Sequence, residues 1–226
     1  MQITFYGHNS FLFESDVSIL TDTFIASNPK AKHIVMEDIK ADHVLITHGH
    51  ADHLADLDKI LAHNDAKIIT MVEVASWLAK QGHSHSHSLN FGGTYEFSKE
   101  TSAKYVQAVH SSSMPDGSYG GHPGSFILKT GGKTIFIAGD TALHSDLKLF
   151  GELNDIDLAI LPIGGNYTMD TEDAVHAAKF LGCNQIIGCH YDSFAEITID
   201  HAAAQNLFKS HQLDLQLMAI GASITL

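Results

Sequence analysis

Short runs of Ile, Phe, Leu and Val near the start of the chain predict β-strands. The runs cover residues 3–6, 10–13 and 17–20, and their close spacing is typical of a β-hairpin with one further strand. Residues 44–47 form another short run, apolar and β-branched, as expected of a buried strand. Leucine or isoleucine then recurs at positions 54, 57, 60 and 61, the spacing of a helix that faces a core.

The first part of the chain passes from strands alone to strands that alternate with helices. The rest of the chain repeats this order. We therefore expect an α/β fold in which two sheets pack face to face with helices outside, a four-layer α/β/β/α sandwich. No stretch rich in Pro, Gly or Ser divides the chain, so one domain over residues 1–226 is expected. The remaining predictions are strands over 67–70, 94–97, 103–109, 125–130, 134–138, 157–161, 185–188, 215–220 and 224–226, and helices over 72–80, 145–153, 171–181 and 199–210.

Composition and charge narrow the functional classes. The 226 residues include 26 Asp and Glu against 13 Lys and Arg, a formal net charge of −13, and the basic residues form no run. A nucleic-acid backbone repels such a chain, so a small-molecule substrate is expected rather than a long polyanion. The two cysteines make no disulfide framework, which favours a reducing compartment.

Membrane and export signals are also missing from the sequence. No apolar run approaches the roughly 18 residues that a membrane-spanning helix needs. The first residues, Met-Gln-Ile-Thr-Phe-Tyr, carry no basic segment and follow a strand pattern directly. We therefore expect a cytoplasmic protein with no membrane partner, and the sequence leaves a homo-oligomer open.

Histidine is unusually frequent, with 17 residues, and the densest group follows an apolar run. His48, His50, Asp52 and His53 lie together there. Such a density is improbable as packing because buried imidazoles and carboxylates need partners. In an extended segment His48 and His50 point the same way, whereas Asp52 and His53, at the start of the next helix, reach a second point. The spacing offers two sets of metal ligands, and the alternative is a polar loop with an Asp helix cap.

Three further polar residues, His110, Asp140 and His190, each come directly after a predicted strand. Open α/β folds place their sites at the carboxyl ends of strands. A single histidine in such a place is usually an ordinary loop residue. Together with the cluster at residues 48–53, the three predict one metal site.

These ligand positions resemble the metallo-β-lactamase superfamily. The pattern is His-x-His-x-Asp-His at 48–53, a lone His at 110, Gly-Asp-Thr at 139–141 and a lone His at 190. Ascorbate-phosphate lactonases and N-acyl-phosphatidylethanolamine phospholipases are more distantly similar, and the resemblance spans nearly the whole chain. Shorter blocks resemble the small, largely uncharacterised metal-dependent hydrolases of this superfamily, namely GHNS at 7–10, LTDT at 20–23, IAGDT at 137–141, LPIGGNYTM at 161–169 and CHYDSF at 189–194.

The resemblance implies the metallo-β-lactamase fold and a site for two divalent metal ions. Imidazole and carboxylate ligands suit zinc or manganese, with iron as a third option. The implied ligands are His48, His50 and His110 for the first ion, Asp52, His53 and His190 for the second, and Asp140 as the bridge.

A binuclear metal-dependent hydrolase is the implied activity. A hydroxide held between the two ions would attack a small ester, lactone or phosphodiester, and Asp52 would carry the proton to the leaving group. The alternative is a mononuclear-iron oxidoreductase of the same fold that acts on persulfides or other sulfur compounds. The complete second ligand set argues against this alternative and against a vestigial site. The diiron electron-transfer relatives have Glu where this chain has His50.

Four more residues are candidates for supporting the site or touching substrate. A metal-bound imidazole usually donates its second N–H to a carboxylate or carbonyl, which favours Asp22 and then His8. Tyr167 and Tyr191 follow strand ends, and either hydroxyl could donate to a developing oxyanion. The alternatives are turn residues for the first pair and aromatic packing for the second. The alternating His and Ser at 83–88 include no carboxylate, so a solvated loop is expected there rather than a metal site.

Overall fold

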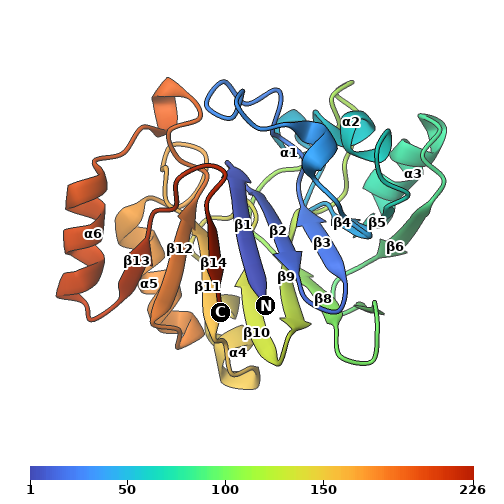
Figure 1. The fold of residues 1–226 in the computed structure, drawn as a ribbon. Helices are drawn as coiled ribbons and strands as arrows, with labels where there is room; N and C mark the ends of the chain where they lie inside the picture. The colour runs from blue at the N-terminus through green and yellow to red at the C-terminus, as the bar shows by residue number, and fades with distance from the viewer.

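Two seven-stranded sheets form the frame of the protein (Figure 1). The computed structural model describes all 226 residues. In the first sheet the order is β14-β1-β2-β3-β4-β5-β6, and in the second it is β13-β12-β11-β10-β9-β8-β7. The strands of the first sheet are β1 (Gln2–Gly7), β2 (Ser10–Glu14), β3 (Ser18–Thr21), β4 (His43–Leu45), β5 (Lys67–Met71), β6 (Ser86–Leu89) and β14 (Ser223–Thr225). Those of the second are β7 (Thr94–Glu96), β8 (Ser102–Gln107), β9 (Gly124–Thr130), β10 (Lys133–Ile137), β11 (Leu158–Pro162), β12 (Gln185–Cys189) and β13 (Asp214–Gln216).

Each sheet joins an antiparallel part to a parallel part. Strands β1, β2 and β3 are antiparallel neighbours, and β3, β4, β5 and β6 are parallel. The second sheet is antiparallel from β7 to β10 and parallel from β10 to β13. Parallel neighbours need a long crossover connection, usually a helix, whereas antiparallel neighbours need only a turn. This is why each half of the sequence passes from strands alone to strands alternating with helices.

The helices lie outside the two sheets, so the predicted four-layer α/β/β/α sandwich is confirmed (Figure 1). None of them combines the length and apolarity that crossing a membrane requires. Two short 3-10 turns, η1 (Met36–Asp38) and η2 (Ala195–Ile197), complete the structure. The helices beside the first sheet are α1 (Ala51–Leu54), α2 (Leu57–Leu61) and α3 (Val72–Lys80), and those beside the second are α4 (Asp146–Leu153), α5 (Thr171–Leu181) and α6 (His201–Ser210).

Alternation along the strands divides the apolar residues between two cores. The larger core, of 37 buried residues, lies between the sheets and continues under α1, α2 and α3. The smaller, of 20 buried residues, lies between the second sheet and its helices. On β10, Ile135 and Ile137 belong to the larger core and Phe136, between them, to the smaller, because successive side chains of a strand point to opposite faces. The frame that holds the strand ends in place is therefore packed on both faces of the second sheet.

The single helix predicted over residues 54–61 was wrong, because the structure has two short helices there. Asp56 lies between α1 and α2, and its carboxylate accepts hydrogen bonds from the backbone N–H groups of Ile25 and Ser27 at 2.9 and 2.8 Å. The same carboxylate accepts from Ser27 Oγ and from Lys59 Nζ. This buried anchor draws the chain toward the 25–27 turn, which the apolar spacing of the helix could not reveal.

The solvated loop expected at residues 83–88 was also partly wrong. Its second half belongs to β6, which pairs in parallel with β5 at the edge of the first sheet. The ring of His87 lies 4.7 Å from that of Tyr95. His83 and His85 pair with the exposed carboxylates of Asp58 and Asp65. The edge of β5 supplies backbone partners that the alternating His and Ser pattern did not indicate.

Candidate metal centre

Histidines and aspartates from several loops converge at one end of the two sheets. His48 follows β4, and His50 precedes α1, in which Asp52 and His53 lie. The seven residues named by the sequence pattern all reach this end, joined by His8 from the β1–β2 turn. Their ligand atoms fall into three groups, each within 4.8 Å, which are His8, Asp52, His53 and His190; His48, His50 and His110; and His48, His53 and Asp140.

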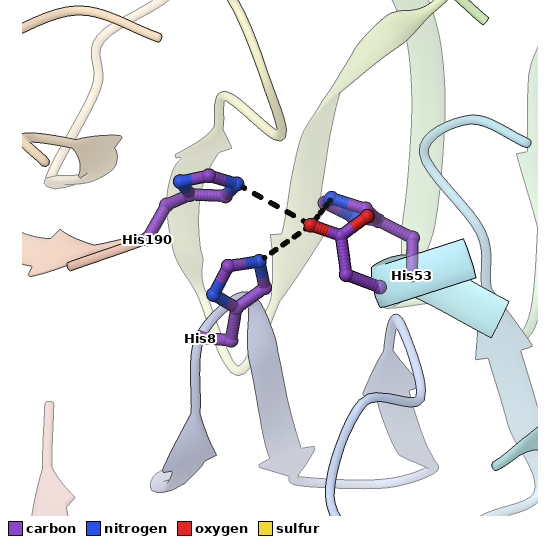
Figure 2. A group of neighbouring side chains, drawn as sticks. His8, His53 and His190 are labelled. Atoms are coloured by element: carbon purple, nitrogen blue, oxygen red, sulfur yellow. Dashed lines mark hydrogen bonds and ion pairs between the residues drawn. The ribbon is translucent and has the colours of Figure 1, made fainter. Parts of the chain in front are cut away.

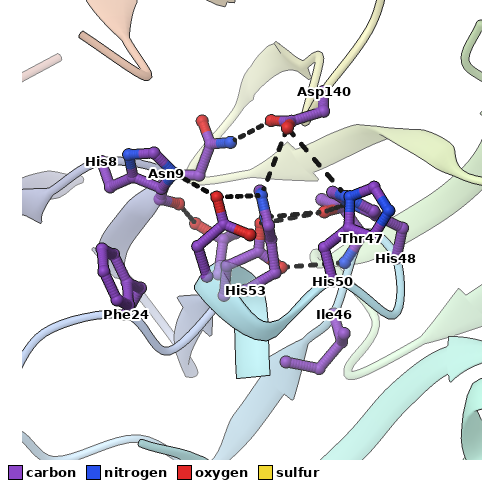
Figure 3. A network of polar contacts seen from close by, with 12 residues as sticks. His8, Asn9, Phe24, Ile46, Thr47, His48, His50, His53 and Asp140 are labelled. Carbon is purple, nitrogen blue, oxygen red and sulfur yellow. Dashed lines mark hydrogen bonds and ion pairs between the residues drawn. The ribbon is translucent and has the colours of Figure 1, made fainter. Parts of the chain in front are cut away.

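One carboxylate oxygen, Asp140 Oδ2, lies at the centre of this arrangement (Figure 3). It lies 3.0 Å from His190 Nε2, 3.4 Å from His53 Nε2, 3.5 Å from His110 Nε2 and 4.0 Å from His48 Nε2. Burial alone would raise the pKa of Asp140, but attraction to His190 and His53 more than offsets it, and the pKa falls well below its usual value. The carboxylate is therefore ionised, with one oxygen within reach of four imidazoles.

The other oxygen of Asp140 is held by Asn9, a residue that the sequence reasoning missed. Asn9 Nδ2 donates to Asp140 Oδ1 at 2.7 Å, which ties the β1–β2 turn of the first sheet to the segment after β10 of the second (Figure 3). Gly139 comes just before, with a positive φ of 58°, and a Cβ there would lie 2.9 Å from the side chain of Thr47. The GHNS block at 7–10 contains Asn9, so its resemblance was the signal that could have identified this contact.

His48, His50 and His110 form a triad of imidazoles beside Asp140. His48 Nε2 and His50 Nδ1 are only 2.9 Å apart, while His48 Nδ1 lies 3.1 Å from Thr47 Oγ1. Burial is the first cause that lowers the pKa of all three rings, most strongly for His48, and neighbouring imidazoles lower it further. The rings are thus neutral in the neutral pH range, which is the form that ligates a metal ion.

His53 is oriented by Asp22, the first of the four predicted supporting residues. Its Nδ1 lies 2.7 Å from Asp22 Oδ2, and Asp22 also accepts from the backbone N–H and Oγ1 of Thr47, each at 2.9 Å. Burial lowers the pKa of His53, but Asp140 and Asp22 more than offset this and raise it well above its usual value. Asp22 therefore fixes both the ring of His53 and the backbone just before His48.

Two imidazoles of the centre have buried nitrogens without hydrogen-bond partners. These are His53 Nε2 and both ring nitrogens of His190. The two Nε2 atoms lie at ion-pair distance from Asp140 Oδ2, 3.4 and 3.0 Å, but not in hydrogen-bonding geometry. Most buried polar atoms are paired, so unpaired ones at a polar cluster call for an explanation such as a bound ion. A divalent cation accepts neutral imidazole nitrogens and carboxylate oxygens, so the donor set fits a metal group.

His8 lies close to His190 and His53 (Figure 2), with its ring centroid 4.0 Å from that of His190. Its Nε2 lies 3.1 Å from Asp52 Oδ2, and its Nδ1 lies 3.0 Å from Ser193 Oγ. Burial, followed by repulsion from His190, lowers the pKa of His8 to about 4, so the ring is neutral at neutral pH. One tautomer satisfies both contacts, with Nε2–H donating to Asp52 and Ser193 donating to Nδ1. His8 was expected to support a metal-bound imidazole, but in the structure it contacts the carboxylate of Asp52 instead.

A cavity of about 450 Å³ opens over the centre. Tyr167 lines it, and this residue is 53% exposed. Tyr191 does not line this cavity and instead faces a separate hollow of about 250 Å³ behind His8. Burial raises the pKa of Tyr191, whose ring packs edge-on against His201. The lining residues are His50, Asp52, His110, Ser111, Asp140, Tyr167, His190, Phe194 and Glu196.

The backbone is unusual at three residues of the centre. His8, Asp22 and His190 have φ values of 56°, 43° and 52°, in the left-handed region that residues other than glycine rarely adopt. Each such conformation costs on the order of 1–3 kcal/mol and persists only where its surroundings hold it. The backbone N–H of His190 donates to the carbonyl of His8 at 3.0 Å, which links two of the three directly.

A four-layer sandwich with this histidine and aspartate cluster at the strand ends is the architecture of proteins with the metallo-β-lactamase fold. Residues 2–190 match the β-lactamase superfamily domain. A UPF0173 metal-dependent hydrolase of Flavobacterium johnsoniae is 47% identical over 227 residues that cover the whole of both chains. The chain belongs to the metallo-β-lactamase superfamily, and within it to the metal-dependent hydrolases of which this relative is one.

Solved structures agree with this assignment. Igni18, a metallo hydrolase from Ignicoccus hospitalis, has a TM-score of 0.89 and 31% sequence identity, covering 99% of this chain and 97% of that one. The isothiocyanate hydrolase from Delia radicum gut bacteria shares the fold, with a TM-score of 0.80 and 19% identity over 100% of this chain and 99% of that one.

Asp22→Asn is expected to weaken metal binding by about 10- to 100-fold, the usual cost of losing a residue that orients a ligand. The amide cannot supply the charge that holds His53 and Thr47 in place. Competition with a chromophoric chelator measures the affinity. Asp42→Asn is the matched control, because Asp42 binds Ser18 at the amino-terminal end of β3 and should leave the affinity unchanged. Equal affinities for both variants would contradict the role of Asp22.

Replacing His83, His85 and His87 together by glutamine is expected to leave the metal content and activity of dialysed protein unchanged. None of the three belongs to a cluster of ligand atoms in the structure. Elemental analysis of the triple variant beside the wild type measures the effect. A loss of one ion per chain would show that this run binds metal in the native protein.

Proposed function

We propose that this chain is a binuclear metal-dependent hydrolase of a small ester, lactone or phosphodiester, acting in the cytoplasm as one domain over residues 1–226. One observation carries the proposal: four imidazole Nε2 atoms lie within 4.0 Å of Asp140 Oδ2, and two of them have no hydrogen-bond partner. Packing alone gives no reason for so many nitrogen atoms to converge on one oxygen.

The first ion would be held by His48, His50 and His110, and the second by Asp52, His53 and His190, with Asp140 between them. Zinc or manganese suits this set of imidazole and carboxylate ligands best. Bound divalent ions of this kind lower the pKa of a water molecule and polarise the group under attack. Asn9 and Asp22 keep Asp140 and His53 oriented toward the ions.

Asp52 is the proton carrier in this proposal. Its Oδ2 accepts from His8, while Oδ1 has no hydrogen-bond partner within the protein and the side chain borders the cavity. Burial raises the pKa of Asp52, but the His8 hydrogen bond and the His53 charge more than offset this and lower it, so the group is an ionised carboxylate at neutral pH. It takes a proton as the water oxygen bonds to the substrate and passes it to the leaving oxygen as the old bond breaks.

Tyr167 is the remaining group of the cavity with a free donor. Its hydroxyl has no hydrogen-bond partner in the chain, and the ring borders the same space as Asp140 and His190. It is placed to donate a hydrogen bond to charge that develops on the substrate oxygen. Tyr191, which lies away from the cavity, has no part in this step.

The first experiment is elemental analysis of untagged protein in which His83, His85 and His87 have been replaced. Two zinc or manganese ions per chain, together with hydrolysis of p-nitrophenyl acetate, a γ-lactone or bis-p-nitrophenyl phosphate, are the expected results. A single redox-active iron with no hydrolysis of any probe would overturn the proposal and favour the oxidoreductase alternative. The next assay would then be oxygen consumption with a persulfide.

A further inference from the structure

The cavity over the metal centre has an outer wall that differs in chemistry from its floor. Five of its nine lining residues are the ligand candidates described above, and the other four are Ser111, Tyr167, Phe194 and Glu196. No lysine or arginine lines the cavity. A phosphate or carboxylate on the part of the substrate remote from the reacting bond would meet no cation on this wall. It would meet the carboxylate of Glu196 instead.

Glu196 is an exposed carboxylate held on an ordered loop. It lies in η2, and its side chain makes no hydrogen bond or ion pair within the chain. The loop itself is fixed by Asp192, whose carboxylate accepts from Ile199 N–H at 3.1 Å and pairs with His201 Nε2 at 2.6 Å. The negative charge is therefore positioned at the cavity and is not neutralised by a protein cation.

Two aromatic rings share this wall with Glu196. Phe194 packs against Phe24 and His8, with ring centroids 5.7 and 5.6 Å apart, so its place is fixed from behind. Tyr167 stands on a turn closed by the Gly165 N–H, which donates to the carbonyl of Met169 at 3.0 Å. Aromatic faces beside a carboxylate are the surroundings in which proteins bind organic cations.

We propose that the outer wall of this cavity binds an organic cation, so that the substrate is a small ester, lactone or phosphodiester with a positively charged group remote from the reacting bond. Glu196, Tyr167 and Phe194 are the residues that determine this specificity. The inference rests on the proposed hydrolase function. It adds that the cavity is polarised, with the charge of the metal ions at the floor and a negative, aromatic wall above.

Three acetate esters of matched size test this preference. They are acetylcholine, its neutral isostere 3,3-dimethylbutyl acetate, and the anion 3-acetoxypropane-1-sulfonate, each incubated with metal-loaded protein in a pH-stat at low ionic strength. We expect kcat/KM to decrease in that order, with about tenfold between cation and anion, the range of one exposed ion pair and one cation–π contact together. Added salt should reduce the difference.

Substitutions at the wall separate charge from general effects on the site. Glu196→Gln should lower the ratio of kcat/KM for the cationic over the neutral ester by about fivefold, and Glu196→Lys should reverse the order of cation and anion. Glu100→Gln is the matched control, because Glu100 lies in the turn before β8, whereas the cavity lies beyond the carboxyl end of that strand. Its ratios should equal those of the wild type.

Calorimetric titration with the corresponding ethyl ethers distinguishes failure of this inference from failure of the hydrolase function. The ethers cannot be hydrolysed, so their affinities report the charge preference alone. Cation binding tighter than anion binding, with a preference that Glu196→Gln reduces, supports the inference even if no ester is a substrate. Equal affinities, or tighter binding of the anion, would overturn it even if all three esters are hydrolysed.

Discussion

Asp140→Ala is expected to abolish hydrolysis and to release both metal ions in the same preparation. Asp140 Oδ2 is the one oxygen within 4.0 Å of imidazoles from both proposed ligand sets. Its loss leaves these rings with no shared counter-charge. We expect kcat/KM to fall by more than about 100-fold, since that is the upper cost of losing a residue that only supports a ligand. Elemental analysis and initial rates on the same sample measure both effects.

The matched control for this variant is Asp157→Ala. Asp157 accepts from the Thr134 N–H and pairs with Lys133 at the end of β10 opposite to Asp140. This control should keep its metal ions and its activity, even where its stability falls slightly. A metal-free Asp140→Ala protein that remained fully active would contradict the two-metal proposal.

Asp52→Asn is expected to lower kcat by about 10²- to 10⁴-fold, the usual contribution of a positioned proton carrier. The amide keeps the size of the side chain and its contact with His8, but it cannot take a proton. The rate is measured at saturating metal, so that a weakened second site does not limit it, and the metal content is determined in parallel. The pKa of Asp52 is lowered, so the wild-type rate should show no titration of this group near neutral pH.

His8→Asn provides the comparison for that variant. His8 orients Asp52 without facing the substrate cavity itself, so its loss should cost less, about tenfold in kcat, with the KM little changed. An Asp52→Asn enzyme with a normal kcat at saturating metal would show that the proton travels by another route. A larger loss for His8→Asn than for Asp52→Asn would reverse the two assignments.

The layers of the fold could be predicted from sequence because burial leaves a periodic record. Strand β10 could be predicted because its isoleucines pack in one core and its phenylalanine packs in the other. The failures lie where polar contacts override that record. Asp56 interrupts a helix because its carboxylate serves the 25–27 turn, and Ser86–Leu89 forms a strand because β5 has an open edge. Neither contact is local in sequence.

The candidate metal ligands could be predicted from the sequence for a different reason. The cluster at residues 48–53 and the single residues after strands stand out because imidazoles and carboxylates are costly to bury without partners. Asn9 and Ser193 escaped notice, since an amide or hydroxyl near a strand end is ordinary in any sequence. Tyr191 was placed near substrate from its position after β12, but the left-handed turn at His190 directs the chain toward the hollow behind His8.

The left-handed backbone at His8, Asp22 and His190 limits which residue types relatives of this protein carry at these three positions. Short polar residues and glycine are the ones that tolerate such angles, and β-branched residues are excluded on steric grounds alone. A descendant that had lost its catalytic role would still favour glycine or a short polar residue such as Asn, Asp or His at these positions. Retention of these residue types in a relative is therefore weak evidence that the relative is catalytically active. His48 and His53 have ordinary backbone angles, so other residue types can replace them once catalysis is lost. Their retention in a relative is therefore better evidence that the relative is active.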